Sequence, residues 1–275
     1  MKIIFYTSLE RRKMINFNHV YAMVIRYFIN LRHNFDRLSD MFYWPALDLF
    51  IWGLTGLYLA TLNINNKDYI FVIITGLVFW IIIWRMQYEI NINILSEIWD
   101  RNIVNIFASP LTLAEWMLSL MTVGFIKMMI SLSFSAILAY IFYQYNVFAF
   151  GPMLLPIVIS LSLTGWATGF FVAAFIIRYG QKIQTLAWTG VALIAPFSVL
   201  YYPLSILPAW AQKVALLIPS THVFEAMRDI HSTGNFSYDK IAISFALNIP
   251  YLFFSLWFFV KMFNKSKKLG LGRLI

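Results

Sequence analysis

Two charged residues, Asp48 and Lys127, lie within otherwise apolar stretches of this 275-residue sequence. A charged group in hydrocarbon is costly, so such residues commonly line a polar pathway or pair with an opposite charge. The sequence leaves two hypotheses open. In the first, Lys127 lines a polar cavity or pairs with Asp48. In the second, Lys127 extends its ammonium group toward the membrane surface and Asp48 is interfacial.

Other residues that commonly carry chemistry show no catalytic arrangement. No glycine is followed by lysine, so the phosphate-binding loop of nucleotide hydrolases is absent. The serine motif GxSxG is also absent. On a helix, His222 and His231 would point to different faces and could not share a metal ion. With no cysteine in the sequence, we expect no catalytic, cofactor-binding or metal-binding residue in this chain.

The composition is that of a membrane protein. Apolar residues make up 61% of the chain and charged residues 12%, about half the charge of a soluble domain. The net charge of +9 is explained by basic residues that flank membrane spans, and we expect no nucleic-acid partner. The expected fold class is an all-α integral membrane protein in contact with lipid.

Six segments have the length and apolar character of a membrane-spanning helix, which needs about 20 residues. Together they predict one transmembrane domain over residues 1–275. The six segments are residues 42–62, 69–84, 117–143, 152–177, 185–202 and 241–262.

The distribution of lysine and arginine predicts the orientation of these spans. Of the 21 basic residues, 16 fall on the side that carries both termini, four on the other side, and Lys127 within the third span. Cytoplasmic segments retain basic residues, so we expect both termini in the cytoplasm.

Residues 18–37 are too polar to span and are expected to form an amphipathic elbow helix. Its apolar residues recur at helical spacing, which favours a helix lying in the cytoplasmic interface. A helix packed on a partner is the alternative. The apolar positions are Val20, Met23, Val24, Tyr27, Phe28 and Leu31.

The longest cytoplasmic stretch between spans is expected at residues 85–115. Ser109-Pro110 should break helical structure there. Thr112 and Glu115 have the spacing of a capping box that opens the third span. Gly165 and Gly169 have the GxxxG spacing of a close helix contact, within the chain or across a dimer.

On the external side, residues 203–239 are punctuated by Pro203, Pro208 and Pro219. The apolar run between the last two prolines is too short to cross a membrane and is expected to dip into the outer leaflet. A second helix is expected at residues 221–231, where Glu225 and Arg228 could pair at i,i+3.

This layout resembles the membrane subunit of an ABC-2-type exporter (a type V ABC transporter permease). NIFASPLTLAEW at residues 105–116 is similar to a cytoplasmic motif of that family. Residues 201–229 resemble its re-entrant helix pair before the last span. The matched positions there are Tyr202, Pro203, Leu207, Pro208, Trp210, Pro219, Thr221, Glu225, Ala226 and Arg228.

The resemblance implies a non-enzymatic subunit of a bacterial cytoplasmic-membrane exporter for lipid-linked glycans, lipids or drug-like amphiphiles. It implies a dimer with a second copy of the chain, and two copies of a separate ATPase that binds ATP and Mg. Contact with that ATPase falls to the elbow helix and to residues 97–115. The residues implied there are Glu97, Asp100, Arg101, Asn102, Phe107, Ser109, Pro110 and Glu115.

Two other functions remain open from the residues alone. A membrane enzyme that modifies lipid would need paired acidic or histidine groups, and no such set accompanies Asp36 and Asp40. A membrane assembly factor without transport activity is the other alternative.

Overall fold

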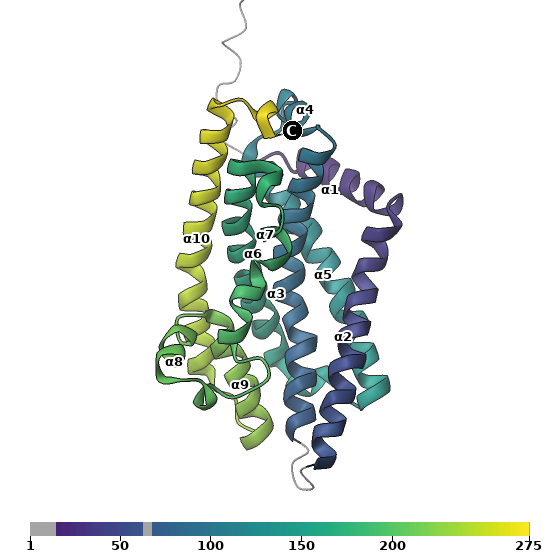
Figure 1. Ribbon diagram of the computed structural model, residues 1–275, viewed down its shortest axis with the longest axis vertical. Helices are drawn as coiled ribbons and strands as arrows, with labels where there is room; N and C mark the ends of the chain where they lie inside the picture. Colours follow the sequence, from purple (N-terminus) through teal and green to yellow (C-terminus); the bar gives the residue numbers. More distant parts are fainter. Residues whose placement is uncertain (1–14, 63–67, 275) are drawn as a thin grey trace, which may run out of the picture.

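The computed structural model describes residues 15–62 and 68–274, with side chains throughout except at positions 62, 68, 69 and 273. Five of the basic residues counted in the prediction of orientation lie outside these ranges: Lys2, Arg11, Arg12, Lys13 and Lys67. Within them the chain is helical and contains no strand. Figure 1 shows an elongated bundle with α4 and the C-terminus at one end and α8 and α9 near the other. We call these the α4 end and the α9 end.

Long helices form the body of the bundle. They contain 26 to 32 residues each, which corresponds to about 39–48 Å and exceeds the roughly 30 Å of a bilayer's hydrocarbon core. These helices are α2 (Phe35–Leu62), α3 (Asp68–Trp99), α5 (Leu113–Tyr143), α6 (Leu154–Tyr179) and α10 (Tyr238–Lys268).

Four helical segments of the described chain are both long and apolar enough to cross a membrane. Helix α2 has the length but is not among these four segments. The four segments are Ile70–Trp99, Leu113–Tyr143, Val147–Ile183 and Tyr238–Lys268.

The expected span at residues 185–202 is wrong as a continuous helix. The segment consists of α7 (Leu186–Thr189), η3 (Val191–Leu193) and η4 (Ala195–Ser198). Pro196 has no N–H to donate and restricts the residue before it. Val199 then adopts the left-handed region with φ of 49°. In Figure 1 this broken segment runs from the α4 end along the bundle toward α8.

Helix α3 is the centre of the bundle and packs against α2, α5 and α6. Its approach to α6 depends on two glycines: a Cβ at Gly165 would lie 2.5 Å from Met86 Cβ, and one at Gly169 would lie 3.2 Å from Gln87 Cα. The GxxxG contact is therefore made within the chain. Helix α3 continues to Trp99, so the first part of the stretch expected at residues 85–115 is helical and buried, and the connection begins only at Asp100.

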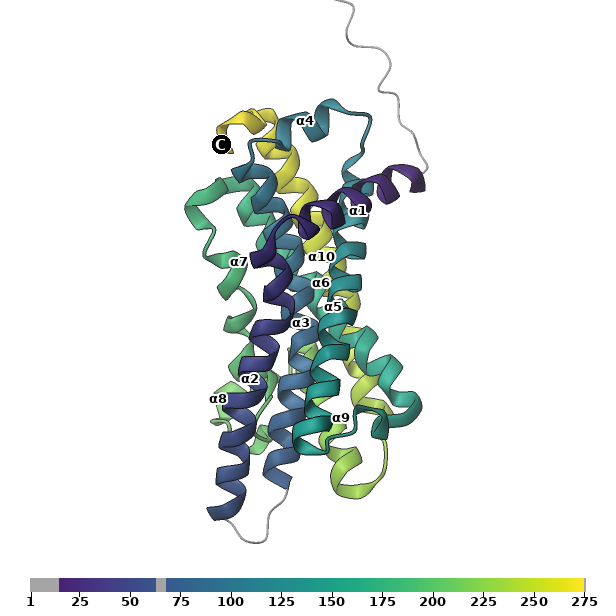
Figure 2. The same ribbon diagram turned by 90° about the vertical axis from the view of Figure 1, so that its right-hand side faces the viewer.

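At the α4 end, α1 (Phe17–Arg32) lies across the bundle, and α4 (Ile103–Ala108) projects from it (Figure 2). The elbow helix was expected at residues 18–37, but α1 ends at Arg32 and α2 already begins at Phe35. The apolar face identified from the sequence packs on the protein, where Val20, Tyr27 and Leu31 are buried.

The C-terminal residues pack back onto the same end. After α10, η6 (Leu271–Leu274) contacts α4, α6 and α10. Leu274 is 4% exposed and lies against Gly180, where an added Cβ would be 3.2 Å from the Leu274 carbonyl oxygen. The described part of the basic tail is thus tied to η2 (Gly180–Ile183).

Short helices cover the α9 end. Helix α9 begins with Pro219, which suits a first helical position, and ends at Gly234 with φ of 71°, a conformation that glycine adopts readily. The two helices expected between residues 203 and 239 are present as α8 and α9. These elements are η1 (Val147–Met153), η5 (Leu204–Ile206), α8 (Ala209–Ala215) and α9 (Pro219–Thr233).

Candidate functional site

A network of buried charges joins α2, α3 and α5. The ammonium group of Lys127 lies 2.5 Å from Glu89 Oε1, and Glu89 is also 3.4 Å from Arg85. Arg85 pairs with Asp40 Oδ2 at 3.0 Å and donates to the Asp40 carbonyl at 2.9 Å. The side chains of Arg85 and Glu89 are fully buried. The two positive and two negative groups of the network neutralise one another, which lowers the free-energy cost of burying them.

The hypothesis that Lys127 pairs with Asp48 is wrong, because its partner is Glu89. Sequence reasoning placed Arg85 and Glu89 in the cytoplasmic stretch at residues 85–115 and therefore did not pair Glu89 with Lys127. The signal was nevertheless present. Arg85, Glu89, Asn93 and Glu97 recur every four residues, the spacing of one helix face.

The second polar cluster ties α1 to the end of α3. Arg26 donates two hydrogen bonds to the Glu97 carboxylate, at 2.7 and 2.9 Å. Asn102, just before α4, donates to the same carboxylate at 2.8 Å. The hydrogen bonds to Glu97 raise the pKa of Arg26 despite partial burial. Glu97 therefore connects α1, α3 and the start of α4.

Glu115 plays a similar role at the start of α5. Its carboxylate accepts hydrogen bonds from the backbone N–H groups of Thr112 at 2.8 Å and Asn16 at 2.9 Å. His19 Nδ1 lies 3.1 Å from the same group. The predicted capping box of Thr112 and Glu115 is confirmed. Glu115 therefore holds the N-terminal end of α1 against α5.

The residues that the family resemblance implied for ATPase contact divide into two groups. Glu97 and Glu115 are buried, Asn102 is partly buried, and Phe107 packs edge-on against Trp116 with 5.2 Å between ring centroids. These four brace the α4 end from inside. The exposed group consists of Asp100, Arg101, Ser109 and Pro110.

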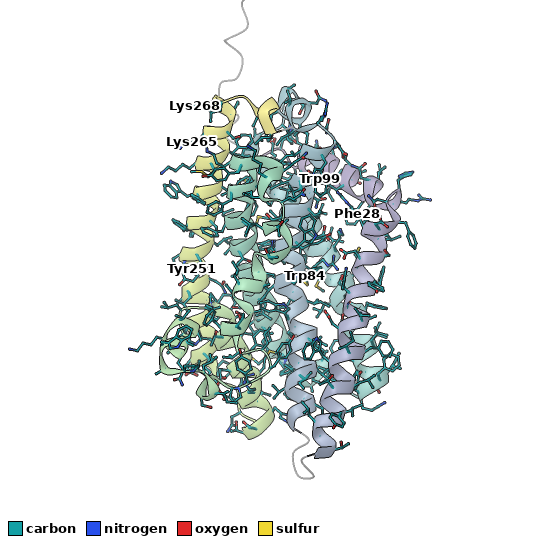
Figure 3. All side chains as sticks on the ribbon, viewed as in Figure 1. Phe28, Trp84, Trp99, Tyr251, Lys265 and Lys268 are labelled. Atoms are coloured by element: carbon teal, nitrogen blue, oxygen red, sulfur yellow. The ribbon has the colours of Figure 1, made fainter. Side chains whose placement is uncertain are left out.

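The exposed group forms one surface with the outer side of α4, where Val104 is 43% exposed. Arg101 lies in the left-handed region with φ of 55°, so the chain turns sharply between α3 and α4. Lys265 and Lys268, in the last turn of α10, lie at the same end of the bundle (Figure 3). We call Asp100, Arg101, Val104, Ser109 and Pro110 the α4 surface.

A cavity of about 780 Å³ opens between the α1–α2 junction, the last turns of α3 and α7. We call it the outer cavity. Its polar lining includes Asn34, Asp36 and Ser39. Its aromatic lining is formed by Tyr43, Trp44, Tyr88, Trp99 and Trp188.

A second cavity of about 310 Å³ shares the lining residue Trp44 with the outer cavity. We call it the deep cavity. Asp48 and Ser135 line it, and its aromatic residues are Trp44, Trp52, Trp80, Trp84 and Tyr201. Trp52 stacks on Tyr201 at 5.9 Å between centroids. Figure 3 places Trp84 about midway along the bundle and Trp99 nearer the α4 end.

The proline-punctuated segment is held together by Glu225 and Arg228 on α9. The predicted pair is confirmed, with 2.8 Å between Arg228 Nη2 and Glu225 Oε1. Arg228 also donates to the Val199 carbonyl at 2.7 Å, and Glu225 accepts from the Leu204 N–H at 3.1 Å. The pair therefore fixes the end of the broken segment to α9.

The remaining residues singled out in this segment are positioned by the backbone. Pro203 precedes η5, Pro208 precedes α8, and Pro219 begins α9. Trp210 is 65% exposed and touches Phe197 edge-on at 6.1 Å. Trp210 is thus a surface residue of α8.

Comparison of the sequence with models of known protein families and with curated proteins found no match.

Proposed function

We propose that this chain is the membrane subunit of an ATP-driven ABC-2-type exporter. The observation that supports the proposal most directly is the assembly at the α4 end. There, an amphipathic helix (α1) is anchored through Glu97 and Glu115, beside a short helix whose outer side is exposed. This combination offers a separate ATPase a rigid platform and a projecting contact. ATP and Mg would be bound by that ATPase.

In this proposal the α4 end faces the cytoplasm, in agreement with the distribution of basic residues. Helix α2 and the broken segment at residues 185–202 complete six passages through the membrane. Broken helices occur at membrane depth where protein or a water-filled cavity covers them, and the broken segment contacts α3 and α6. Helices α8 and α9 form the external re-entrant pair.

The hydrogen bonds supply a route from the ATPase to the bundle. Pressure on the α4 surface would act on Asn102, which is bonded to Glu97 at the end of α3. Glu97 in turn holds Arg26 on α1. A shift of α4 would therefore move α1 and α3 together, as packed elements that slide against their neighbours.

The two cavities mark the proposed substrate path. They lie between α2, α3 and the broken segment, and α2 presents exposed Trp44 and Trp52, which line them. This face is where we place the second copy of the chain. The two copies would then enclose a path for a lipid-linked glycan, lipid or drug-like amphiphile.

Co-purification tests the proposal. A tagged version of this chain would be expressed with a candidate ABC ATPase from the same genome and reconstituted in liposomes. We expect the two to purify as a complex and the ATPase rate to exceed that of the ATPase with empty liposomes. If the chain purifies alone, or converts a lipid without nucleotide, the exporter proposal is wrong.

A further inference from the structure

The deep cavity contains two polar groups that the fold leaves unused. Ser135 is fully buried, and its hydroxyl has no hydrogen-bond partner. Asp48 forms no hydrogen bond or ion pair with any residue in the described ranges 15–62 and 68–274. The Asp48 side chain is exposed and lines the same cavity. Buried hydroxyl groups in native proteins generally have a hydrogen-bond partner, so the unpartnered Ser135 hydroxyl points to a ligand that would also meet the Asp48 carboxylate.

We propose that the deep cavity binds a hydrophobic organic cation that carries a protonated amine. The inference names the substrate class of the proposed exporter and rests on that function. The ammonium group would pair with the Asp48 carboxylate and donate a hydrogen bond to Ser135 Oγ. Its apolar body would lie against the tryptophans of the same cavity.

The aromatic lining favours a cation over a neutral ligand. Trp44, Trp52, Trp80, Trp84 and Tyr201 surround the cavity, and ring faces attract positive charge within about 6 Å of the centroid. The protein already uses this interaction nearby, since the Arg85 guanidinium lies 4.9 Å from the Trp84 ring. A cation in the deep cavity would meet the same kind of surface.

The charge of the two cavities supports the same conclusion. Four carboxylates line them, and Arg37 is the one lysine or arginine among their described lining residues. Asp40 is paired with Arg85, which leaves an excess of negative charge within a chain of net charge +9. A phosphate-bearing ligand would be repelled there. The four carboxylates are Asp36, Asp40, Asp48 and Asp100.

The test measures energy transfer from tryptophan to a dansyl-labelled primary alkylamine bound to the full chain in lipid nanodiscs. The N-acetylated form of the same dye is the neutral control ligand. We expect the amine to bind at least about tenfold more tightly than its acetylated form. Tetraphenylphosphonium, a cation without a hydrogen-bond donor, should compete with it.

Two substitutions probe the site. Asp48→Asn keeps the size of the side chain and should weaken amine binding about tenfold or more. Ser135→Ala should weaken amine binding about threefold and leave tetraphenylphosphonium affinity unchanged. Asp239→Asn, at an exposed aspartate that lines neither cavity, should bind like the wild type.

Equal binding of the amine and its acetylated form would overturn the inference, as would wild-type affinity in both Asp48→Asn and Ser135→Ala. No ATPase is needed for these measurements. A failure here, alongside successful co-purification with the ATPase, would reject the substrate class and leave the exporter proposal standing.

Discussion

Lys127 on α5 and Glu89 on α3 form a buried ion pair, with 2.5 Å between Nζ and Oε1. The pair lies beside a second one, Arg85 with Asp40, so the packing of three long helices depends on matched charges. Breaking a buried pair from one side is more damaging than replacing both partners, because a lone buried charge remains.

Lys127→Met should therefore destabilise the protein by about 3–5 kcal/mol, measured as unfolding in detergent. Replacing both partners, with Lys127→Met and Glu89→Gln, should recover much of that loss. Lys213→Met is the matched control, since Lys213 is exposed on α8 and should change stability by less than about 0.5 kcal/mol. An unaltered stability and full transport in Lys127→Met would contradict the role assigned to the pair.

Arg26→Gln should release α1 from the end of α3, because Glu97 loses its two charged hydrogen bonds. Since the chain has no cysteine, a single cysteine placed at Val24 would report this release as faster thiol labelling. Arg32→Gln, at an exposed position of the same helix, should leave labelling unchanged. Equal labelling rates in the two variants would reject Glu97 as the anchor of α1.

The α4 surface should affect coupling without affecting stability. Asp100→Ala and Arg101→Gly change exposed side chains, and glycine suits the left-handed backbone of residue 101. We expect each variant to insert and melt like the wild type, while stimulation of the partner ATPase falls several-fold. Normal stimulation in both variants would place the ATPase contact elsewhere.

Gly165→Leu should force α6 away from α3, because even a Cβ at this position would lie 2.5 Å from Met86 Cβ. Overpacking of this kind typically costs about 1–3 kcal/mol, measurable as a lower melting temperature. Gly272→Ala is the control, since an added Cβ there meets nothing within 4 Å. A melting temperature equal to that of the wild type would show that α6 can shift freely.

Asp229 on α9 should make stability depend on pH. Burial alone would raise the pKa of Asp229, but hydrogen bonds from Lys240 and Ser237 and the nearby positive charges lower it below its usual range. Its contribution is therefore present above its unfolded pKa of about 3.9 and is lost as pH falls through the lower folded value. The melting temperature of Asp229→Asn should lie below that of the wild type near neutral pH, and the two should converge in acid. A constant difference across that range would contradict the assignment.

Local sequence signals predicted local structure well. The spacing of Thr112 and Glu115 predicted the cap of α5, and Glu225 and Arg228 predicted their own ion pair. Each depends on residues within one turn of a helix, where position along the chain determines the distance in space. The central parts of the apolar helices were also predicted, because a run of about 20 apolar residues is itself the signal of a spanning helix.

Two regions could not be predicted from hydropathy. The polar residues from Arg85 to Glu97 were assigned to a cytoplasmic stretch, yet they are buried within the bundle, because hydropathy does not distinguish water from a polar protein interior. The partner of Lys127 depends on how α3 and α5 pack, which no local pattern encodes. Conversely, residues 185–202 are apolar, but this segment, which contains Pro196, breaks into α7, η3 and η4 and turns at Val199.

The broken segment has one more consequence. A continuous helix protects its amides through a cooperative ladder of hydrogen bonds, whereas α7, η3 and η4 contain three or four residues each and protect few. Regions with few such bonds open at low free-energy cost. Deuterium should therefore enter the amides of residues 186–202 well before those of α3, which identifies the wall of the two cavities as the part of the bundle that opens most readily.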